Sequence, residues 1–174
     1  MTDKYSARMR RGTHFSFSFV RNPFDRLVSA YNNKILELDD VPGPMQAMGL
    51  SHNMGFPAFL ECIAGTVDAA IDVHLLPQTS ILCLDGQLIP NFIGRLETME
   101  TDWQRLETRL KQERLPLLGH LPEKNRRRGD DHTDVSQYFS DSGLVQLVVE
   151  RYGDDLGLFY GDVNLEVLSR GQLS

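Results

Sequence analysis

The hydrophobic pattern changes its period abruptly near residue 21, and this change constrains the fold more than any other feature of the sequence. Phe15, Phe17 and Phe19 alternate with two serines, and Val20 closes the run. An alternation of period two that is rich in aromatic residues predicts a β-strand. The small serines let the second face pack closely, as an inner strand requires. We therefore expect a strand at residues 15–20.

A helix is predicted directly after this strand. Apolar residues recur there at spacings of three and four, the stripe of an amphipathic helix: Phe24, Leu27, Val28, Tyr31, Ile35 and Leu38. Asn22 is a favourable N-cap, and Pro23 suits the first helical position because its missing N–H is not needed there. Arg21 is then expected at the C-terminal tip of the strand, facing a helix N-terminus. In open α/β sheets, ligands bind at this edge.

The rest of the chain alternates between the two kinds of pattern. We expect a long loop at residues 41–57, a short helix at 56–64, short strands at 80–84 and 92–96 around a turn at Asp85–Gly86, a charged helix at 101–114, an irregular segment at 116–134 and a final helix capped by Ser140. Strands alternating with helices predict an α/β fold with a mainly parallel sheet flanked by helices. With 174 residues and no internal repeat, the chain is predicted to form one domain, residues 1–174.

The charge balance excludes one broad class of function. The formal net charge is −6, which argues against a general nucleic-acid binder. Two basic islands, residues 8–11 and 124–128, stand against this acidic background, each either a solvated face or an anion site. The sequence has no run of eighteen apolar residues, so we predict no membrane segment in this chain, and no secretory signal is visible.

The segment from Phe17 to Tyr31, FSFVRNPFDRLVSAY, resembles the 3′-phosphate-binding motif of the chondroitin 4-O- and heparan sulfate 2-O-sulfotransferases and their bacterial relatives. The resemblance implies that Arg21, and Ser29 eight residues later, hold the 3′-phosphate of the sulfate donor, 3′-phosphoadenosine 5′-phosphosulfate (PAPS). The chemistry is suitable, because arginine offers phosphate a planar fork of donors and the serine hydroxyl adds another. The helix N-terminus would add its dipole and free N–H groups. In the competing interpretation, Arg21 pairs with a carboxylate and Ser29 only packs against the sheet.

Later segments extend the resemblance to this family of carbohydrate sulfotransferases, sulfotransferase family 2. They are residues 91–103, 138–140 and 149–159. Most of their positions are core or cap positions, so they support the fold rather than the chemistry. The implied architecture is the P-loop-NTPase-like sulfotransferase fold.

His74, in the stretch DVHLLPQ, resembles a histidine in the middle of related enzymes. A neutral imidazole is able to take the proton from a sugar hydroxyl as that hydroxyl attacks sulfur, so His74 is a candidate catalytic base. A structural role, such as hydrogen bonding to the Pro77–Gln78 loop, is the alternative. His14, which directly precedes the predicted strand, is a weaker candidate for the base.

Arg126 and Arg127 belong to the basic stretch 124–129, where the family has a loop that closes over the donor nucleotide. The resemblance makes them candidate ligands of the 3′-phosphate or of an anionic acceptor sugar, and a solvated loop is the competing account. No histidine has metal-ligand spacing, so we predict no metal site.

The family begins with a strand and a lysine- and glycine-containing loop, resembling a P-loop, that wraps the donor's 5′-phosphosulfate. The sequence shows no counterpart of this loop, and residues 1–13 resemble the end of a helix or loop that leads into the second strand. We therefore expect an N-terminally incomplete domain that lacks the first strand and the loop. An exposed sheet edge, open to self-association, is a further expectation. A fragment, a mis-started gene product and a natural remnant all agree with this reading.

The resemblance implies a PAPS-dependent sulfotransferase that moves a sulfuryl group to a hydroxyl of a carbohydrate acceptor. The alternative is a non-catalytic remnant of the fold that acts as a binding or interaction module, because the loss of one preorganised donor already costs about 10²–10³ in rate. A nucleotide kinase of related fold agrees less well, since the motif G-x-x-x-x-G-K-[ST] is absent. The expected protein is soluble, in the cytoplasm if it is bacterial and in the Golgi lumen if it is part of a longer eukaryotic protein.

Overall fold

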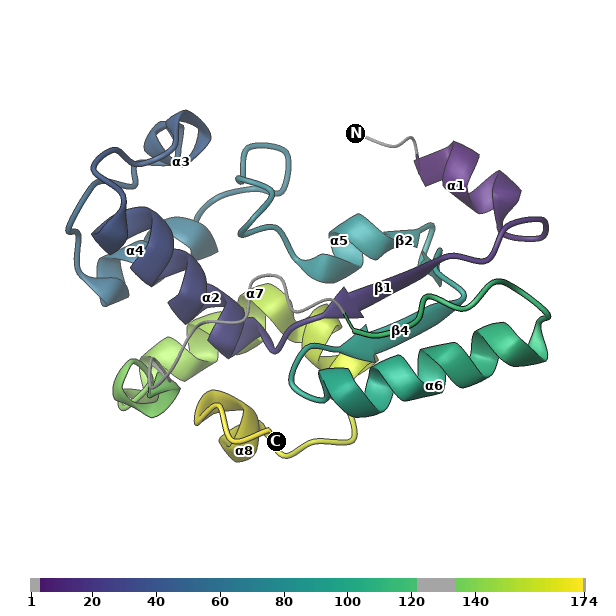
Figure 1. Cartoon of the computed structure of the whole chain (residues 1–174). Helices are drawn as coiled ribbons and strands as arrows, with labels where there is room; N and C mark the ends of the chain where they lie inside the picture. The colour runs from purple at the N-terminus through teal and green to yellow at the C-terminus, as the bar shows by residue number, and fades with distance from the viewer. Residues whose placement is uncertain (1–3, 122–133, 174) are drawn as a thin grey trace.

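The computed structural model describes residues 4–121 and 134–173 (Figure 1). Its strands are β1 (Phe17–Val20), β2 (Cys83–Leu84), β3 (Gln87–Leu88) and β4 (Phe92–Arg95). Its α-helices are α1 (Lys4–Arg10), α2 (Pro23–Tyr31), α3 (Gly43–Ala47), α4 (Phe56–Ala64), α5 (Gln78–Leu82), α6 (Met99–Gln112), α7 (Ser142–Tyr160) and α8 (Leu165–Ser169). A π-helix, η1 (Asn32–Glu37), and a 3₁₀-helix, η2 (Val135–Gln137), complete the set. Helix α6 lies along β4, and α7 packs against α2, α4 and α5.

Strands β1 and β4 form a parallel pair whose register runs from Phe17 opposite Phe92 to Val20 opposite Arg95. Gly94 lies opposite Phe19, and a Cβ atom at Gly94 would sit 2.4 Å from the Phe19 ring. Glycine leaves room for this ring, which stacks on Trp103 of α6 with 6.2 Å between the centroids. The strands predicted at residues 15–20 and 92–96 are confirmed, and the aromatic contact holds α6 against the pair.

Helix α2 begins where the sequence predicts it. The Asn22 side chain accepts a hydrogen bond from the Phe24 N–H at 3.2 Å, and Pro23 is the first helical residue. The predicted apolar stripe is buried as far as Tyr31. After Tyr31 the backbone widens into the π-helix η1, in which Ile35 is fully buried. The stripe is therefore continuous in space although the helix changes its winding.

The strand predicted at residues 80–84 is wrong for most of its length. Helix α5 occupies Gln78–Leu82, and only the two residues of β2 are extended. The carboxylate of Asp155, on α7, accepts the backbone N–H groups of Gln78 and Thr79, both at 2.7 Å. A carboxylate that satisfies the first N–H groups stabilises a helix start, and here it comes from a distant part of the chain.

Two further local predictions need correction. The segment at residues 41–57 is not loop throughout, because α3 forms within it and buries Met45. The final helix is capped by Asp141 rather than Ser140, since the Asp141 carboxylate accepts the Gly143 N–H at 2.7 Å. The helices predicted at 56–64 and 101–114 are present as α4 and, with a shift of two residues, as α6.

The sheet within the described residues is smaller than the mainly parallel sheet that we predict. It consists of the β1–β4 pair and a separate antiparallel hairpin of β2 and β3. The hairpin turns at the predicted Asp85–Gly86, where both residues have positive φ, 50° and 72°. Helices and parallel strands together confirm the α/β class. In the part of the chain that the structure describes, no helix has the length and apolar character needed to cross a membrane.

Candidate functional site

Arg21 lies at the C-terminal tip of β1, between the strand and helix α2, as the sequence predicts. Its backbone is held on one side by the side chain of Gln78. The Arg21 N–H donates to Gln78 Oε1 at 2.9 Å, and Gln78 Nε2 donates to the Arg21 carbonyl at 2.8 Å. The backbone of Arg21 is therefore held by a residue that the sequence analysis names only as a possible partner of His74.

Arg21 is half-buried, and its guanidinium makes no hydrogen bond or ion pair with residues 4–121 or 134–173. Its charge still acts on its neighbours. Burial raises the pKa of Asp25, and the nearby Arg21 charge offsets part of that rise. Burial likewise lowers the pKa of Arg26, and Arg21 adds to this decrease. Within the described residues, the competing interpretation of Arg21 as half of a carboxylate ion pair is not supported.

Ser29 lies on α2 and is half-buried. Its hydroxyl makes no hydrogen bond with another side chain or backbone group in the described part of the chain. Because helical residues three apart are neighbours, Ser29 sits beside Arg26. Arg21 precedes α2 and Arg26 lies near its start, whereas Ser29 lies about one turn further along, near the end of the helix. Arg21 and Arg26 both carry positive charge.

The N-terminus of α2 differs from the expectation of free N–H groups. Pro23 has no N–H, the Phe24 N–H is taken by Asn22, and the Asp25 carboxylate bonds to its own N–H. The Asn22 amide also donates to Asp25 at 2.5 Å. The helix dipole still favours an anion at this end, but the backbone N–H groups of Phe24 and Asp25 already have partners.

Arg26 of α2 also holds the segment that carries His74. The Arg26 guanidinium donates to the carbonyls of Leu76 at 2.7 Å and Val73 at 3.2 Å, on either side of His74. The carbonyl of Leu75 accepts a hydrogen bond from the buried Tyr152 hydroxyl at 2.6 Å. Helices α2 and α7 thus hold the segment that carries His74.

The His74 ring is paired with a buried carboxylate. Its Nδ1 lies 2.8 Å from Asp72 Oδ1, and its side chain is 60% exposed while that of Asp72 is 9% exposed. In the neutral ring this pairing keeps the proton on Nδ1, because a carboxylate only accepts. Nε2 is then the basic nitrogen. The alternative partner, the Pro77–Gln78 loop, is not what the ring contacts.

The remaining candidates lie elsewhere. His14 is exposed at the opposite end of β1 from Arg21, with its Nδ1 2.8 Å from the Thr13 hydroxyl. Arg126 and Arg127 lie outside the described residues. No group of three or more histidine, cysteine, aspartate or glutamate side chains able to hold a metal ion is found in residues 4–121 and 134–173.

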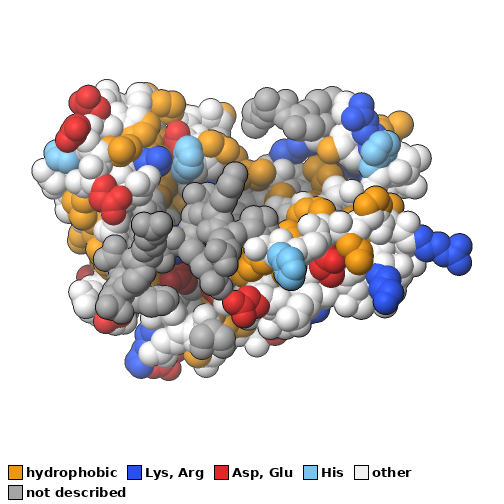
Figure 2. All heavy atoms as spheres, viewed as in Figure 1, with side chains coloured by type: hydrophobic (Ala, Val, Ile, Leu, Met, Phe, Trp, Pro, Cys, Tyr) orange, Lys and Arg blue, Asp and Glu red, His pale blue; other side chains and the backbone are white. Residues whose placement is uncertain are grey.

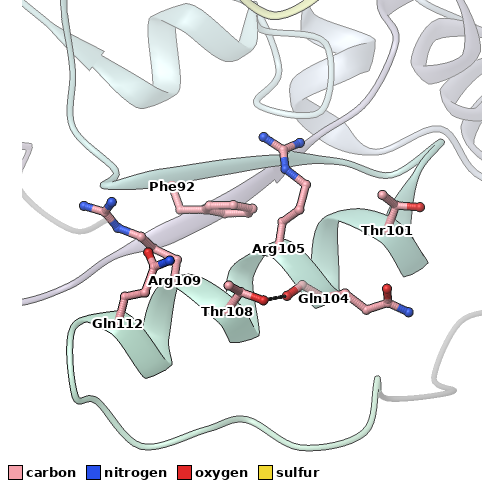
Figure 3. Close-up of a pocket in the computed structure, with 7 residues that line it drawn as sticks. All are labelled: Phe92, Thr101, Gln104, Arg105, Thr108, Arg109 and Gln112. Atoms are coloured by element: carbon pink, nitrogen blue, oxygen red, sulfur yellow. Dashed lines mark hydrogen bonds between the residues drawn. The ribbon is translucent and has the colours of Figure 1, made fainter.

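Two hollows lie along α6 and do not include Arg21, Ser29 or His74. The larger, about 520 Å³, is lined by Phe92 and by one face of α6, with Arg105 and Arg109 pointing toward the strand (Figure 3). Both arginines already have acidic partners, Asp102 and Glu113. On the face shown in Figure 2, basic, acidic and hydrophobic side chains are interspersed.

Sequence reasoning missed the residues that hold the site together. Gln78 and Asp155 fix the Arg21 backbone, and Arg26 and Asp72 hold the His74 segment. Arg26 and Asp72 lie inside the two stretches that the sequence analysis quotes, so their positions were available as a signal. Asp155 lies in the stretch 149–159, but no local pattern indicated its role, because that role depends on contacts with residues 76 and 77 positions away.

Comparison with known proteins identifies the family of the chain. The model of the sulfotransferase family matches residues 1–161. Carbohydrate sulfotransferase 14 from Mus musculus and from Homo sapiens are each 29% identical to the chain over 110 residues, which cover 55% of this chain and 28% of the relative. The matched region is therefore less than a third of those relatives' length. No solved structure matches significantly. Because the family model matches residues 1–161, a range that includes Arg21, Ser29 and His74, the chain belongs to the sulfotransferase family.

Proposed function

We propose that this chain binds the 3′-phosphate of PAPS through Arg21 and Ser29 and serves the transfer of a sulfuryl group to a carbohydrate hydroxyl. The observation that carries the proposal is the state of Arg21. Its backbone is fixed by hydrogen bonds, while its guanidinium is unpaired within the described residues. Similarity to proteins named carbohydrate sulfotransferases supports a carbohydrate acceptor.

The described residues suit a phosphate at the start of α2. The Arg21 guanidinium would take two phosphate oxygens, and the Ser29 hydroxyl would donate to a third. The helix dipole adds a favourable potential. Arg126 or Arg127, outside the described residues, would add positive charge to the nucleotide or to an anionic acceptor.

His74 is the proposed base for the acceptor. As the acceptor hydroxyl attacks, a bond forms between its oxygen and sulfur, and the bond between sulfur and the bridging phosphate oxygen breaks. The hydroxyl proton passes to His74 Nε2, and 3′-phosphoadenosine 5′-phosphate (PAP) leaves with the bridging oxygen. Asp72 supports this role because it holds Nδ1 and stabilises the imidazolium that forms.

The first test is binding of PAP by isothermal titration calorimetry to the parent protein and to Arg21→Ala. Loss of a charge-assisted phosphate contact should cost about 1.5–3 kcal/mol, roughly ten- to hundredfold in affinity. Arg109→Ala is the matched control, since that arginine, on α6, pairs with Glu113 and is half-exposed. A folded protein that binds no PAP, or that binds it equally well without Arg21, would refute the donor site.

The second candidate is a binding or interaction module without catalysis. It rests on the lack of a G-x-x-x-x-G-K-[ST] loop within these 174 residues. PAP binding without any sulfuryl transfer from PAPS to a panel of glycosaminoglycans would favour this candidate. Transfer that depends on Arg21 and His74 would exclude it.

Self-association through a sheet edge remains a proposal that sedimentation velocity tests.

A further inference from the structure

The backbone of β1 alternates between its two sides. The carbonyl of Ser16 accepts the Asn91 N–H and that of Val20 accepts the Leu96 N–H, each at 2.8 Å, so these residues face β4. In a parallel strand the next residue along turns its N–H and C=O to the other side. Arg21 therefore turns both groups away from β4, toward a side where no strand pairs with β1 in the described part of the chain.

The Gln78 side chain takes the place of a neighbouring strand at this one residue. Its amide oxygen accepts from the Arg21 N–H at 2.9 Å, and its amide nitrogen donates to the Arg21 carbonyl at 2.8 Å. Few side chains offer a donor and an acceptor with this spacing, and an amide is one of them. Gln78 is buried, and it supplies the partner of both backbone groups of Arg21.

Gln78 is in turn held by Asp155, which is fully buried on α7. The Asp155 carboxylate accepts the N–H groups of Gln78 and Thr79 and the Thr79 hydroxyl, all at 2.7 Å. It also lies 3.4 Å from the Gln78 amide nitrogen, which orients the amide with its oxygen toward the Arg21 N–H. A chain of contacts thus runs from α7 through α5 to Arg21.

We propose that Gln78 is a positioning residue for donor binding, which acts only by fixing the backbone of Arg21. This inference rests on the proposed role of Arg21 as a phosphate ligand. A ligand group that is held in place before binding loses less conformational freedom when the phosphate arrives. Gln78 touches no phosphate itself, so its effect on affinity has to pass through Arg21.

The test is a double-mutant cycle of Gln78→Met and Arg21→Ala with PAP as the probe, measured by calorimetry and, for weak binding, by ligand-observed NMR. Methionine keeps the approximate volume of glutamine and removes both hydrogen bonds. We expect Gln78→Met to weaken PAP binding about tenfold when Arg21 is present and less than twofold in the Arg21→Ala background. The exchange rate of the Arg21 amide hydrogen should also rise in Gln78→Met.

The matched control is Asp102→Asn. Asp102 is buried and accepts the Arg95 N–H at 2.7 Å at the end of β4, so it is the same kind of anchor one strand away. This variant should lower the melting temperature and leave PAP affinity within twofold. If Gln78→Met does not fold, Gln78→Asn, whose amide is one methylene short of Arg21, takes its place in the cycle.

The outcomes separate the inference from the function on which it rests. Equal weakening by the Gln78 variant with and without Arg21, or no weakening at all, would overturn the positioning role. An Arg21→Ala protein that binds PAP as well as the parent would overturn the donor site and the inference with it. If Gln78→Met weakens PAP binding only in the protein that retains Arg21, and the Arg21 amide exchanges faster, both the inference and the donor site are supported.

Discussion

Asn22 and Glu97 are joined by a hydrogen bond of 2.6 Å, from the Asn22 N–H to Glu97 Oε1, on the β4 side of the turn that follows β1. The second Glu97 oxygen accepts the Tyr160 hydroxyl at 3.1 Å. Glu97 thus anchors the residue next to Arg21, on the side opposite to Gln78. Burial raises the pKa of Glu97 above its ordinary value of 4.5, although these hydrogen bonds offset part of the rise.

The first prediction concerns the pH dependence that Glu97 brings to stability. Because its folded pKa is raised, the native state binds more protons than the unfolded state between 4.5 and the raised value. Its contribution to stability is complete below this window and falls as pH rises through it. Glu97→Gln removes that titration. The free energy of unfolding of the variant should therefore rise relative to that of the parent by about 1.4 kcal/mol for each pH unit of the window. Urea unfolding at several pH values checks this, and a pH-independent difference would contradict it.

The second prediction concerns Gly94. A methyl group at this position would lie 2.4 Å from the Phe19 ring and 3.1 Å from the Asp102 side chain. Gly94→Ala should therefore destabilise the protein by about 1–3 kcal/mol through overpacking. Gly157→Ala is the control, since a Cβ there meets nothing within 4 Å and the residue is helical, so this change should stabilise by about 0.5–1 kcal/mol. Thermal unfolding of both variants provides the comparison.

The third prediction uses two adjacent acids on α7. Asp155 is fully buried and accepts hydrogen bonds from Gln78 and Thr79, whereas Asp154 is exposed. Asp155→Ala leaves buried donors unpaired and should cost about 3 kcal/mol or more. Asp154→Ala should stay within about 0.5 kcal/mol of the parent. Chemical denaturation measures both, and similar losses for the two variants would mean that the buried contacts contribute little.

The fourth prediction separates catalysis from donor binding. His74→Gln removes the proposed base and should lower sulfuryl transfer by about 10²–10⁴ while PAP affinity stays within twofold. His14→Gln is the control, because that ring lies at the far end of β1, and its activity should match the parent. The assay follows transfer of labelled sulfate from PAPS to a carbohydrate acceptor. Equal activity of the two variants would remove His74 from the reaction.

Local chemistry was enough to predict the strand–helix turn that presents Arg21. The change from period two to a spacing of three and four, with Asn22 and Pro23 at the junction, depends only on neighbouring residues, and the structure confirms it. The helix at Phe56–Ala64 and the turn at Asp85–Gly86 follow from equally local signals. The roles of Arg21, Ser29 and His74 remain predictions, drawn from a resemblance to a family to which the chain is now shown to belong.

Tertiary structure decided what the local pattern could not. Residues 80–82 read as strand, yet they form helix α5 because Asp155, 77 positions after Gln78, satisfies the first N–H groups of that helix. The two anchors of the turn also come from far along the chain, since Gln78 is 57 positions from Arg21 and Glu97 is 75 positions from Asn22. The sequence by itself determined where the strand–helix turn of Arg21 lies. Only the folded chain determined what holds it, because a buried N–H takes whichever acceptor the packing brings within reach.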